Sequence, residues 1–351
     1  MSDIMDIFEV YFNHKLNIKR INKHLNKSHI REKANKFDGI RAGCVQREIK
    51  IVKSIEEYAD MLHRFIKEGS EKGCDIIVFP EYNFLDLVGI FPFFDKINKS
   101  FNKKDSNENE NTAINNKDNE LIYSILLSAS EPIQRAIEYI LSFYAKMYSV
   151  YIYSGSYLLR EGDYLYNCGT LISRNGEILG RQKKLHLTDY EEKIGLKKGD
   201  ELLAFDLDIG RVACPICMDA TYFETFKIAR NLGCNIIILP IANNEKYNTY
   251  RALRGIWSRV QESFVYGFKS SLNGEVLGIK FTGKSGIFAP ISLTERKDGI
   301  VSISKNYYGN SLVVADIDIK RLEFERERAQ YFGDTNEIFE KDYYSKTYNR
   351  I

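Results

Sequence analysis

From residue 39 onward, short apolar segments alternate with stretches of helical periodicity, and this alternation restricts the fold more than any other feature. Residues 75–79 (DIIVF) and 235–240 (NIIILP) read as strands that are apolar on both faces. Residues 55–72 carry apolar side chains at spacings of three and four, which predicts a helix. Strands of this kind need helices on both faces of their sheet, so the sequence predicts an α/β protein.

The other predicted elements continue this pattern. Helices are expected from Pro132 to about residue 148, over 223–232, and up to residue 262. Further short strands follow up to residue 316, and no repeat period is visible. The remaining strands are predicted over residues 40–45, 150–155, 166–173, 179–187 and 210–217.

The first 36 residues precede this pattern and read as a helical extension. Their apolar residues recur at spacings of three, four and seven, which is typical of an amphipathic helix that lies on a core or on a partner subunit. The opposite face is basic, but three acidic residues near the start weaken any case for a membrane surface. The apolar stripe consists of Ile4, Ile7, Phe8, Tyr11, Ile18, Ile21 and Leu25.

Two other segments are expected to lie outside the core. Residues 98–119 hold eight Asn, four Lys and four acidic residues, so they offer little to bury and are expected to form an inserted loop or disordered segment. Residues 333–351 form a short C-terminal tail.

Charge and cysteine content exclude several classes of protein. Fifty Lys and Arg balance 48 Asp and Glu, and the net charge of +2 provides no field that would hold nucleic acid. Six cysteines in 351 residues are too few for a secreted disulfide scaffold. No segment approaches a membrane span and the N-terminus does not resemble a signal peptide, so we expect a cytoplasmic protein.

Three predicted strands each place a reactive side chain at or near the C-terminal end, where active sites of α/β proteins gather. These side chains are Glu81, Lys184 and Cys217. A thiolate is a strong nucleophile when a base takes its proton, and Glu81 can be that base. Four of the five histidines lie in the N-terminal extension or the first helix of the domain, which leaves His186 as the one candidate for a Cys–His pair and favours the carboxylate.

A lysine near the carbonyl carbon would stabilise the oxyanion of a tetrahedral intermediate, and a backbone N–H after the cysteine would add a second donor. Lys184 and the amide of Met218 fit these roles. Each residue taken alone also fits a purely structural role, with Glu81 capping a helix, Lys184 in solvent and Cys217 as one more buried thiol.

Three ordered motifs carry a family resemblance. They are Phe79-Pro80-Glu81, the segment from Lys184 to Leu187 (KLHL), and the segment from Cys217 to Glu224 (CMDATYFE). In this order and at these separations they resemble the nitrilase superfamily of carbon-nitrogen hydrolases, in particular its amidase-like branch. The resemblance covers about residues 39–330, and it assigns residues 37–332 to one carbon-nitrogen hydrolase domain.

The resemblance implies a four-layer αββα sandwich that pairs into a homodimer or a higher homo-oligomer. It implies that Glu81 is the general base, Lys184 stabilises the oxyanion and Cys217 is the nucleophile. Glu192 would be the second glutamate, which positions the substrate and the lysine. The implied chemistry is attack on an amide or nitrile carbon, loss of ammonia or an amine, and hydrolysis of a thioester, with no metal or organic cofactor.

Met218-Asp219 resembles amide-cleaving branches more than nitrile-cleaving ones, so we expect a small-molecule amide or N-carbamoyl substrate. Tyr82, Tyr222 and Phe223 are candidates for pocket walls, and Asn243 for a donor to a substrate carbonyl. Phe223 replaces a proline that many relatives have. Nitrile hydrolysis, acyl transfer to an amine and a non-catalytic binding module that kept the fold remain alternatives.

Two further motifs carry little weight. Residues 278–285 match the P-loop pattern, but a short strand ended by Pro290 is expected after them, where a phosphate site needs a helix. Cys214 and Cys217 form a C-x-x-C at a strand end, which favours neither a redox pair nor a zinc site without a second ligand pair. Pro215 between them removes a donor from the strand.

Overall fold

A computed structural model describes residues 2–28, 39–92, 94–95, 98, 116–329, 336, 338–344 and 346. Its strands form one hydrogen-bonded path that splits into two layers at β1 (Ile40–Glu48). The first part of β1 lies between β2 (Ile76–Val78) and the antiparallel β14 (Ser311–Ile317), whereas residues 46–48 pair with β10 (Tyr266–Val276). This change of partner separates the two sheets. The apolar pattern of the strands does not by itself show which strand belongs to which sheet.

The other strands extend each layer. Beside β2 lie β3 (Tyr151–Tyr153), β5 (Tyr164–Ile172), β4 (Tyr157–Glu161) and β6 (Ile178–Lys183). Beside β10 lie β9 (Ile236–Ile241), β8 (Gly210–Ala213), β7 (Ala204–Leu207), β11 (Ile279–Phe281), β12 (Gly286–Phe288) and β13 (Ile300–Ile303).

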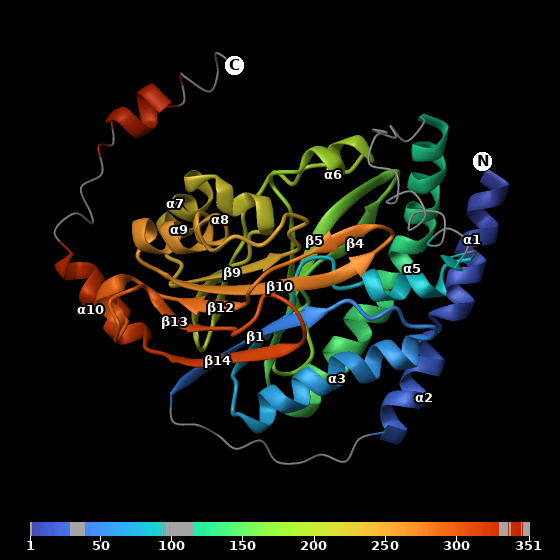
Figure 1. Cartoon of the computed structure of the whole chain (residues 1–351), viewed down its shortest axis with the longest axis horizontal. Coiled ribbons are helices and arrows are strands. Elements are labelled where there is room, and N and C mark those ends of the chain that lie inside the picture. The colour runs from blue at the N-terminus through green and yellow to red at the C-terminus, as the bar shows by residue number, and fades with distance from the viewer. Residues whose placement is uncertain are drawn as a thin grey trace.

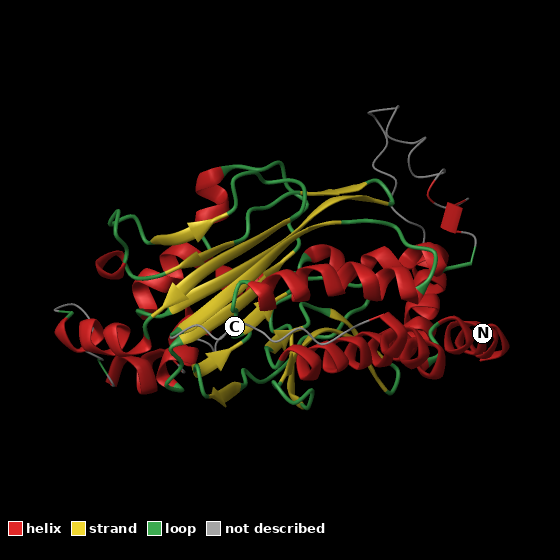
Figure 2. Cartoon of the chain, turned by 90° about the horizontal axis from the view of Figure 1, so that it is seen from below, coloured by secondary structure: helices red, strands yellow, loops and turns green. Residues whose placement is uncertain are grey.

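In the described part of the chain, three of the hydrophobic clusters lie between four layers, because successive residues of the buried strands point to opposite faces. On β2, Ile77 packs toward helices α3 (Ile55–Glu71) and α5 (Asn116–Tyr148), whereas Ile76 and Val78 face the second sheet. On β9, Ile236 and Ile238 face the first sheet, and Ile237 packs toward α7 (Phe223–Asn231) and α9 (Ile256–Ser263). Figures 1 and 2 show helices outside both sheets, which confirms the predicted αββα sandwich.

The N-terminal extension consists of two helices, α1 (Ser2–Lys15) and α2 (Ile18–Ser28), rather than one. They lie beside α3 and α5 (Figure 1). The predicted stripe is partly wrong, because Ile7 is 69% exposed while Phe12 is fully buried. The break between the helices changes their phase, so one helical period over both cannot describe the buried face.

Helix α5 begins at residue 116 and contains Pro132 in its interior, so the prediction that Pro132 opens a helix is wrong. The hydroxyl of Ser128 donates to the carbonyl of Ser124 at 2.9 Å, and that of Ser130 donates to the carbonyl of Leu127. The turns around the proline therefore have additional donors for their carbonyls. Of the predicted insertion, residue 98 and residues 116–119 are described, and the rest lies outside the described residues.

The remaining helices are short. They are η1 (Leu85–Ile90), α6 (Asp189–Lys193), η2 (Cys217–Thr221), α8 (Thr249–Leu253), η3 (Ile291–Leu293), α10 (Ile319–Arg328) and η4 (Phe339–Tyr344). The segment with η4 contacts α7, where Tyr344 Oη donates to Glu224 Oε1 at 2.6 Å and Lys227 forms an ion pair with Glu340. Among the helices of the described residues, none has the length and apolar character needed to cross a membrane.

Candidate active site

Glu81 lies in a turn after β2, and the segment around Gly155 and Ser156 holds this turn in place. Tyr82 follows with a left-handed φ of 52°, and its amide donates to Ser156 Oγ at 3.0 Å. Gly155 allows the close approach, because a Cβ there would lie 1.9 Å from the carbonyl oxygen of Pro80. The glutamate is 1% exposed and reaches the same edge of the sheet as the other candidate residues.

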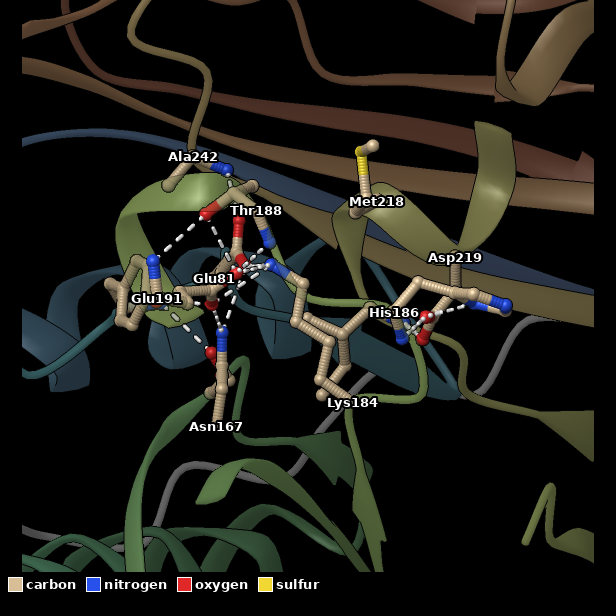
Figure 3. A network of polar contacts seen from close by, with 12 residues as sticks. Glu81, Asn167, Lys184, His186, Thr188, Glu191, Met218, Asp219 and Ala242 are labelled. Atoms are coloured by element: carbon tan, nitrogen blue, oxygen red, sulfur yellow. Dashed lines mark hydrogen bonds and ion pairs between the residues drawn. The ribbon is translucent and has the colours of Figure 1, made fainter. Parts of the chain in front are cut away.

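Lys184 directly follows β6 and is also 1% exposed. Its Nζ donates to Glu81 Oε1 at 2.8 Å and to both carboxylate oxygens of Glu191, at 2.8 and 3.0 Å. The Nδ2 atom of Asn167 donates to the same two carboxylates, at 2.9 Å to Glu81 and 2.8 Å to Glu191. One ammonium and one amide therefore connect two buried carboxylates (Figure 3).

The prediction that Glu192 is the second glutamate is wrong by one residue, since Glu191 contacts the lysine. Glu192 forms an ion pair with Lys198 at 2.7 Å, and its side chain is 49% exposed. Thr188 caps α6, and in this capping box its Oγ and backbone N–H contact Glu191. The T-x-x-E pattern over residues 188–191 is the sequence signal that marks Glu191 as the residue that points back into the site.

Cys217 begins the 3-10 turn η2, with a left-handed φ of 45°. Strand β8 ends at Ala213, before Pro215, so the strand predicted over 210–217 is shorter than expected. Strained backbone of this kind in a non-glycine residue is common at functional sites. The thiol lies next to Glu81 and Lys184, whose charges shift its pKa in opposite directions.

Asp219 connects the cysteine turn to the lysine segment, a role that the sequence alone does not predict. Its carboxylate accepts hydrogen bonds from the amide of Ile216 at 2.8 Å and from the amide of His186 at 2.7 Å. His186 Nδ1 lies 3.0 Å from the same carboxylate, and its ring stacks on Tyr222 at 4.1 Å. His186 thus contacts Asp219 and Tyr222, whereas the carboxylate that acts on the Cys217 thiol is that of Glu81.

Burial and charge give the two carboxylates different proton affinities. Burial raises the pKa of Glu81 above its usual value despite the opposing charge of Lys184. Glu191 has a lowered pKa because Lys184, Thr188 and Tyr82 together outweigh its burial. Of the two carboxylates, Glu191 is therefore the one that favours the ionised form, and Glu81 is the one that takes up a proton more readily.

The other two groups rest in their protonated forms. Burial and the adjacent Glu81 carboxylate raise the pKa of the Cys217 thiol well above its usual value. The carboxylates and the cysteine raise the pKa of Lys184, which outweighs the effect of its burial. Cys217 is therefore a neutral thiol at rest, and Lys184 stays charged.

The predicted pocket residues have different environments. The Tyr82 hydroxyl donates to Glu191 Oε1. Tyr222 and Phe223 are 40% and 42% exposed at the outer side of the site, and Asn243 lines a cavity next to it. Met218 follows the cysteine in η2, and Figure 3 shows its side chain turned away from the Glu81–Lys184 pair.

The P-loop-like segment and the C-x-x-C motif both lie in surroundings that fit a structural role. After the P-loop-like segment, Gly286 begins strand β12 rather than a helix, and Ser285 Oγ donates to the carbonyl of Val45 at 3.0 Å. All six cysteines are free thiols. Within the described part of the chain, no cluster of three or more possible metal ligands is present.

Comparisons with known proteins identify the family of the chain. The sequence model described as carbon-nitrogen hydrolase matches residues 41–323. A probable hydrolase YhcX from Bacillus subtilis is 28% identical over 300 residues, which cover 82% of this chain and 52% of that protein, so the chain spans about half of its length. A nitrilase from Pyrococcus abyssi is 26% identical over 314 residues, covering 87% of this chain and 99% of that protein.

Solved structures support the same fold. An amidase from Nesterenkonia sp. AN1, determined with acrylamide added at its active site cysteine, superimposes with a TM-score of 0.58. It is 16% identical, and the match covers 82% of this chain and 97% of that one. Together with the family match over residues 41–323, these findings show that the chain belongs to the carbon-nitrogen hydrolase family of the nitrilase superfamily.

Proposed function

We propose that the protein hydrolyses the carbon-nitrogen bond of a small-molecule amide or N-carbamoyl compound through a thioester on Cys217. The observation that carries this proposal is the convergence of a thiol, a carboxylate of raised pKa and a charged lysine from three separate segments. An omega-amidase from Bos taurus, 27% identical over 202 residues that cover 55% of this chain and 70% of that protein, supports an amide substrate.

In the first half of the reaction, Glu81 takes the proton of Cys217 while the sulfur attacks the carbonyl carbon. The resting thiol is neutral, so proton removal and attack have to occur together. Lys184 and the backbone amide of Met218 stabilise the oxyanion. Glu81 returns the proton to the nitrogen, which leaves as ammonia or an amine and gives the thioester.

In the second half, a water attacks the thioester carbon while Glu81 takes one of its protons. The carbon–sulfur bond breaks, the carboxylic acid is released, and the proton returns to the Cys217 thiolate. The sum is one amide and one water converted to one acid and one amine. Glu191 keeps Lys184 charged and in place at both stages, since it forms two of the lysine's hydrogen bonds.

The experiment is a measurement of ammonia or amine release over a panel of aliphatic amides, N-carbamoyl compounds and nitriles. We expect Cys217→Ala to lose turnover by at least about a thousandfold, because the nucleophile is removed. Intact-protein mass spectrometry after rapid quenching should show the acyl group on the wild type and not on the variant.

Cys214→Ala is the matched control, because Cys214 is a buried thiol three residues away and outside the polar cluster. It should keep most of the activity. Equal turnover by the wild type and Cys217→Ala would overturn the mechanism, and preferential turnover of nitriles would overturn the proposed substrate class.

A further inference from the structure

A second buried lysine lies next to the candidate active site and has no role in the proposed mechanism. Lys269, on β10, is 4% exposed. Its Nζ makes one hydrogen bond, 3.4 Å to the carbonyl oxygen of Ala252, and no carboxylate of the described residues forms an ion pair with it. Lysines are almost never buried this deeply without a partner, so the position calls for an explanation.

The surroundings of Lys269 place it beside the nucleophile. In the β9–β10 pairing it lies opposite Leu239, and β9 leads directly to Ala242. The amide of Ala242 donates to Glu81 Oε2 at 2.8 Å (Figure 3). A thiolate at Cys217 would raise the pKa of Lys269, which indicates that the two side chains are close.

A cavity begins where the catalytic cluster ends. The residue after Ala242, Asn243, lines this cavity together with Lys269, Thr282 and Arg251. Arg251 pairs with Glu245 at 3.0 Å on the outer side, where its side chain is 50% exposed. Glu245, the carboxylate that also lines the cavity, is the partner of Arg251. Lys269 is therefore the buried cation of the cavity, and no carboxylate in the described part of the chain pairs with it.

We propose that Lys269 binds an anionic group of the substrate, so that the preferred substrates are amides with a carboxylate at the end away from the reacting carbonyl. This inference rests on the proposed amide hydrolysis. A carboxylate in the cavity would supply the missing partner, and a desolvated charge pair of this kind is both strong and selective.

A second possible role for Lys269 is to stabilise the Cys217 thiolate. The two roles differ in the substrates that they affect. A lysine that binds substrate matters only for anionic amides, whereas a lysine that acts on the sulfur matters for every amide. The comparison of charged and neutral amides of the same shape therefore separates them.

The kinetic test compares succinamate with succinamide, which differ only in a carboxylate and a carboxamide, and malonamate and glutaramate as shorter and longer monoamides. We expect the wild type to prefer one of the monoamides over its diamide. Lys269→Met should lower kcat/KM for that monoamide by about 100-fold or more, mainly through KM, and change that of the diamide by less than about threefold. Lys280→Met, which removes an exposed lysine of β11, should change neither.

An equal fall in kcat for monoamide and diamide would assign Lys269 to the thiolate and overturn the inference. So would a wild type that prefers the diamide. Thermal unfolding of Lys269→Met and of a second variant, Lys269→Gln, checks that any loss comes from the site and not from the fold.

A binding test separates this inference from the proposed function. The probes are succinate and glutarate, titrated by calorimetry into Cys217→Ala protein with and without Lys269→Met. Binding that requires Lys269 supports the anion site even if no amide is turned over, in which case the proposed function fails alone. Amide turnover with dicarboxylate binding that is absent or independent of Lys269 overturns the inference and leaves the proposed function intact.

Discussion

Lys269 shows how a single buried charge can cost stability in order to provide a site. Burial lowers the pKa of its ammonium to about 8, compared with about 10.4 in an unfolded chain. Between these two pH values the unfolded chain binds more protons than the folded one. The free energy of unfolding therefore rises with pH in this window, and below about pH 8 the full cost of the buried charge is present.

We predict that Lys269→Met is more stable than the wild type at pH 7, by about 1–3 kcal/mol, because an apolar side chain of similar length needs no charged partner. The difference should shrink as the pH rises from about 8 to 10. Urea unfolding at pH 6.5, 8 and 10 measures it, with Lys280→Met as the control whose difference stays constant. A Met variant that is less stable at every pH would show that the lysine gains more from its surroundings than it loses.

Single residues also show what the sequence can reveal about this site. Glu81 and Cys217 follow buried strands within recognisable motifs, so their convergence could be predicted. Lys269 lies on the same face of β10 as Gly267, which packs against α9, and a lysine on such a face is a visible signal that no motif marks. Asp219 could not be assigned, because its three backbone donors come from two segments that meet only in the folded chain.

At the scale of elements, the orientation of α6 decides which glutamate serves the site. Neighbouring residues on a helix point about 100° apart, so only one of Glu191 and Glu192 can face Lys184. The capping box fixes the phase, since Thr188 Oγ1 donates to Glu191 Oε2 at 2.9 Å. A motif aligned by residue type alone cannot detect a shift of one position.

We predict that Glu191→Gln lowers kcat/KM by about 100-fold, because it removes a carboxylate that holds the buried Lys184 and leaves part of the lysine's charge unpaired. Glu192→Gln is the matched control and should stay within about threefold of the wild type, since its partner Lys198 is a surface residue. Steady-state kinetics on the best amide, with thermal unfolding of both variants, makes the comparison. A larger loss in Glu192→Gln than in Glu191→Gln would contradict the placement.

Element boundaries were harder to predict than element types. The sequence places α3, β2 and β9 within a few residues, because long apolar periodicity and short buried runs are strong local signals. The local pattern places Pro132 at a helix start, because proline lacks the N–H that an interior position donates. In α5 the packing of the helix on the sheet outweighs that local preference, and such tertiary effects cannot be derived from a local pattern.

At the scale of the whole molecule, a net charge of +2 conceals an uneven distribution. Glu81, Glu191 and Lys184 together carry a net charge of about −1 when both carboxylates are ionised, whereas Lys269 places a separate positive charge at the neighbouring cavity. Bulk composition could therefore exclude a polyanion partner but not an anionic small molecule. A site of this kind can attract one carboxylate while the surface as a whole stays neutral.

The outer surface of α7 and the nearby C-terminal segment favour self-association, which the family resemblance also implies. Apolar side chains remain exposed along it, with Phe223 at 42%, Ile228 at 48% and Phe339 at 50%. Exposed apolar surface of this extent, next to a site, commonly marks a protein interface, and identical subunits most often pair around a twofold axis. We therefore expect a homodimer or a larger homo-oligomer that buries this surface.

The predicted outcome is that Ile228→Asp shifts the protein toward the monomer, because a charge would be buried in an apolar contact at a cost of several kcal/mol. Size-exclusion chromatography with light scattering, over a dilution series, measures the mass. Leu179→Asp on β6 is the matched control, since Leu179 is 40% exposed on a different element. A wild type that is monomeric at micromolar concentration, or an Ile228→Asp variant with unchanged mass, would show that α7 is not the surface through which subunits meet.

Dissociation should also lower turnover at the concentrations where the mass falls. The reason is that Phe223 of this surface directly follows Tyr222, which stacks on His186.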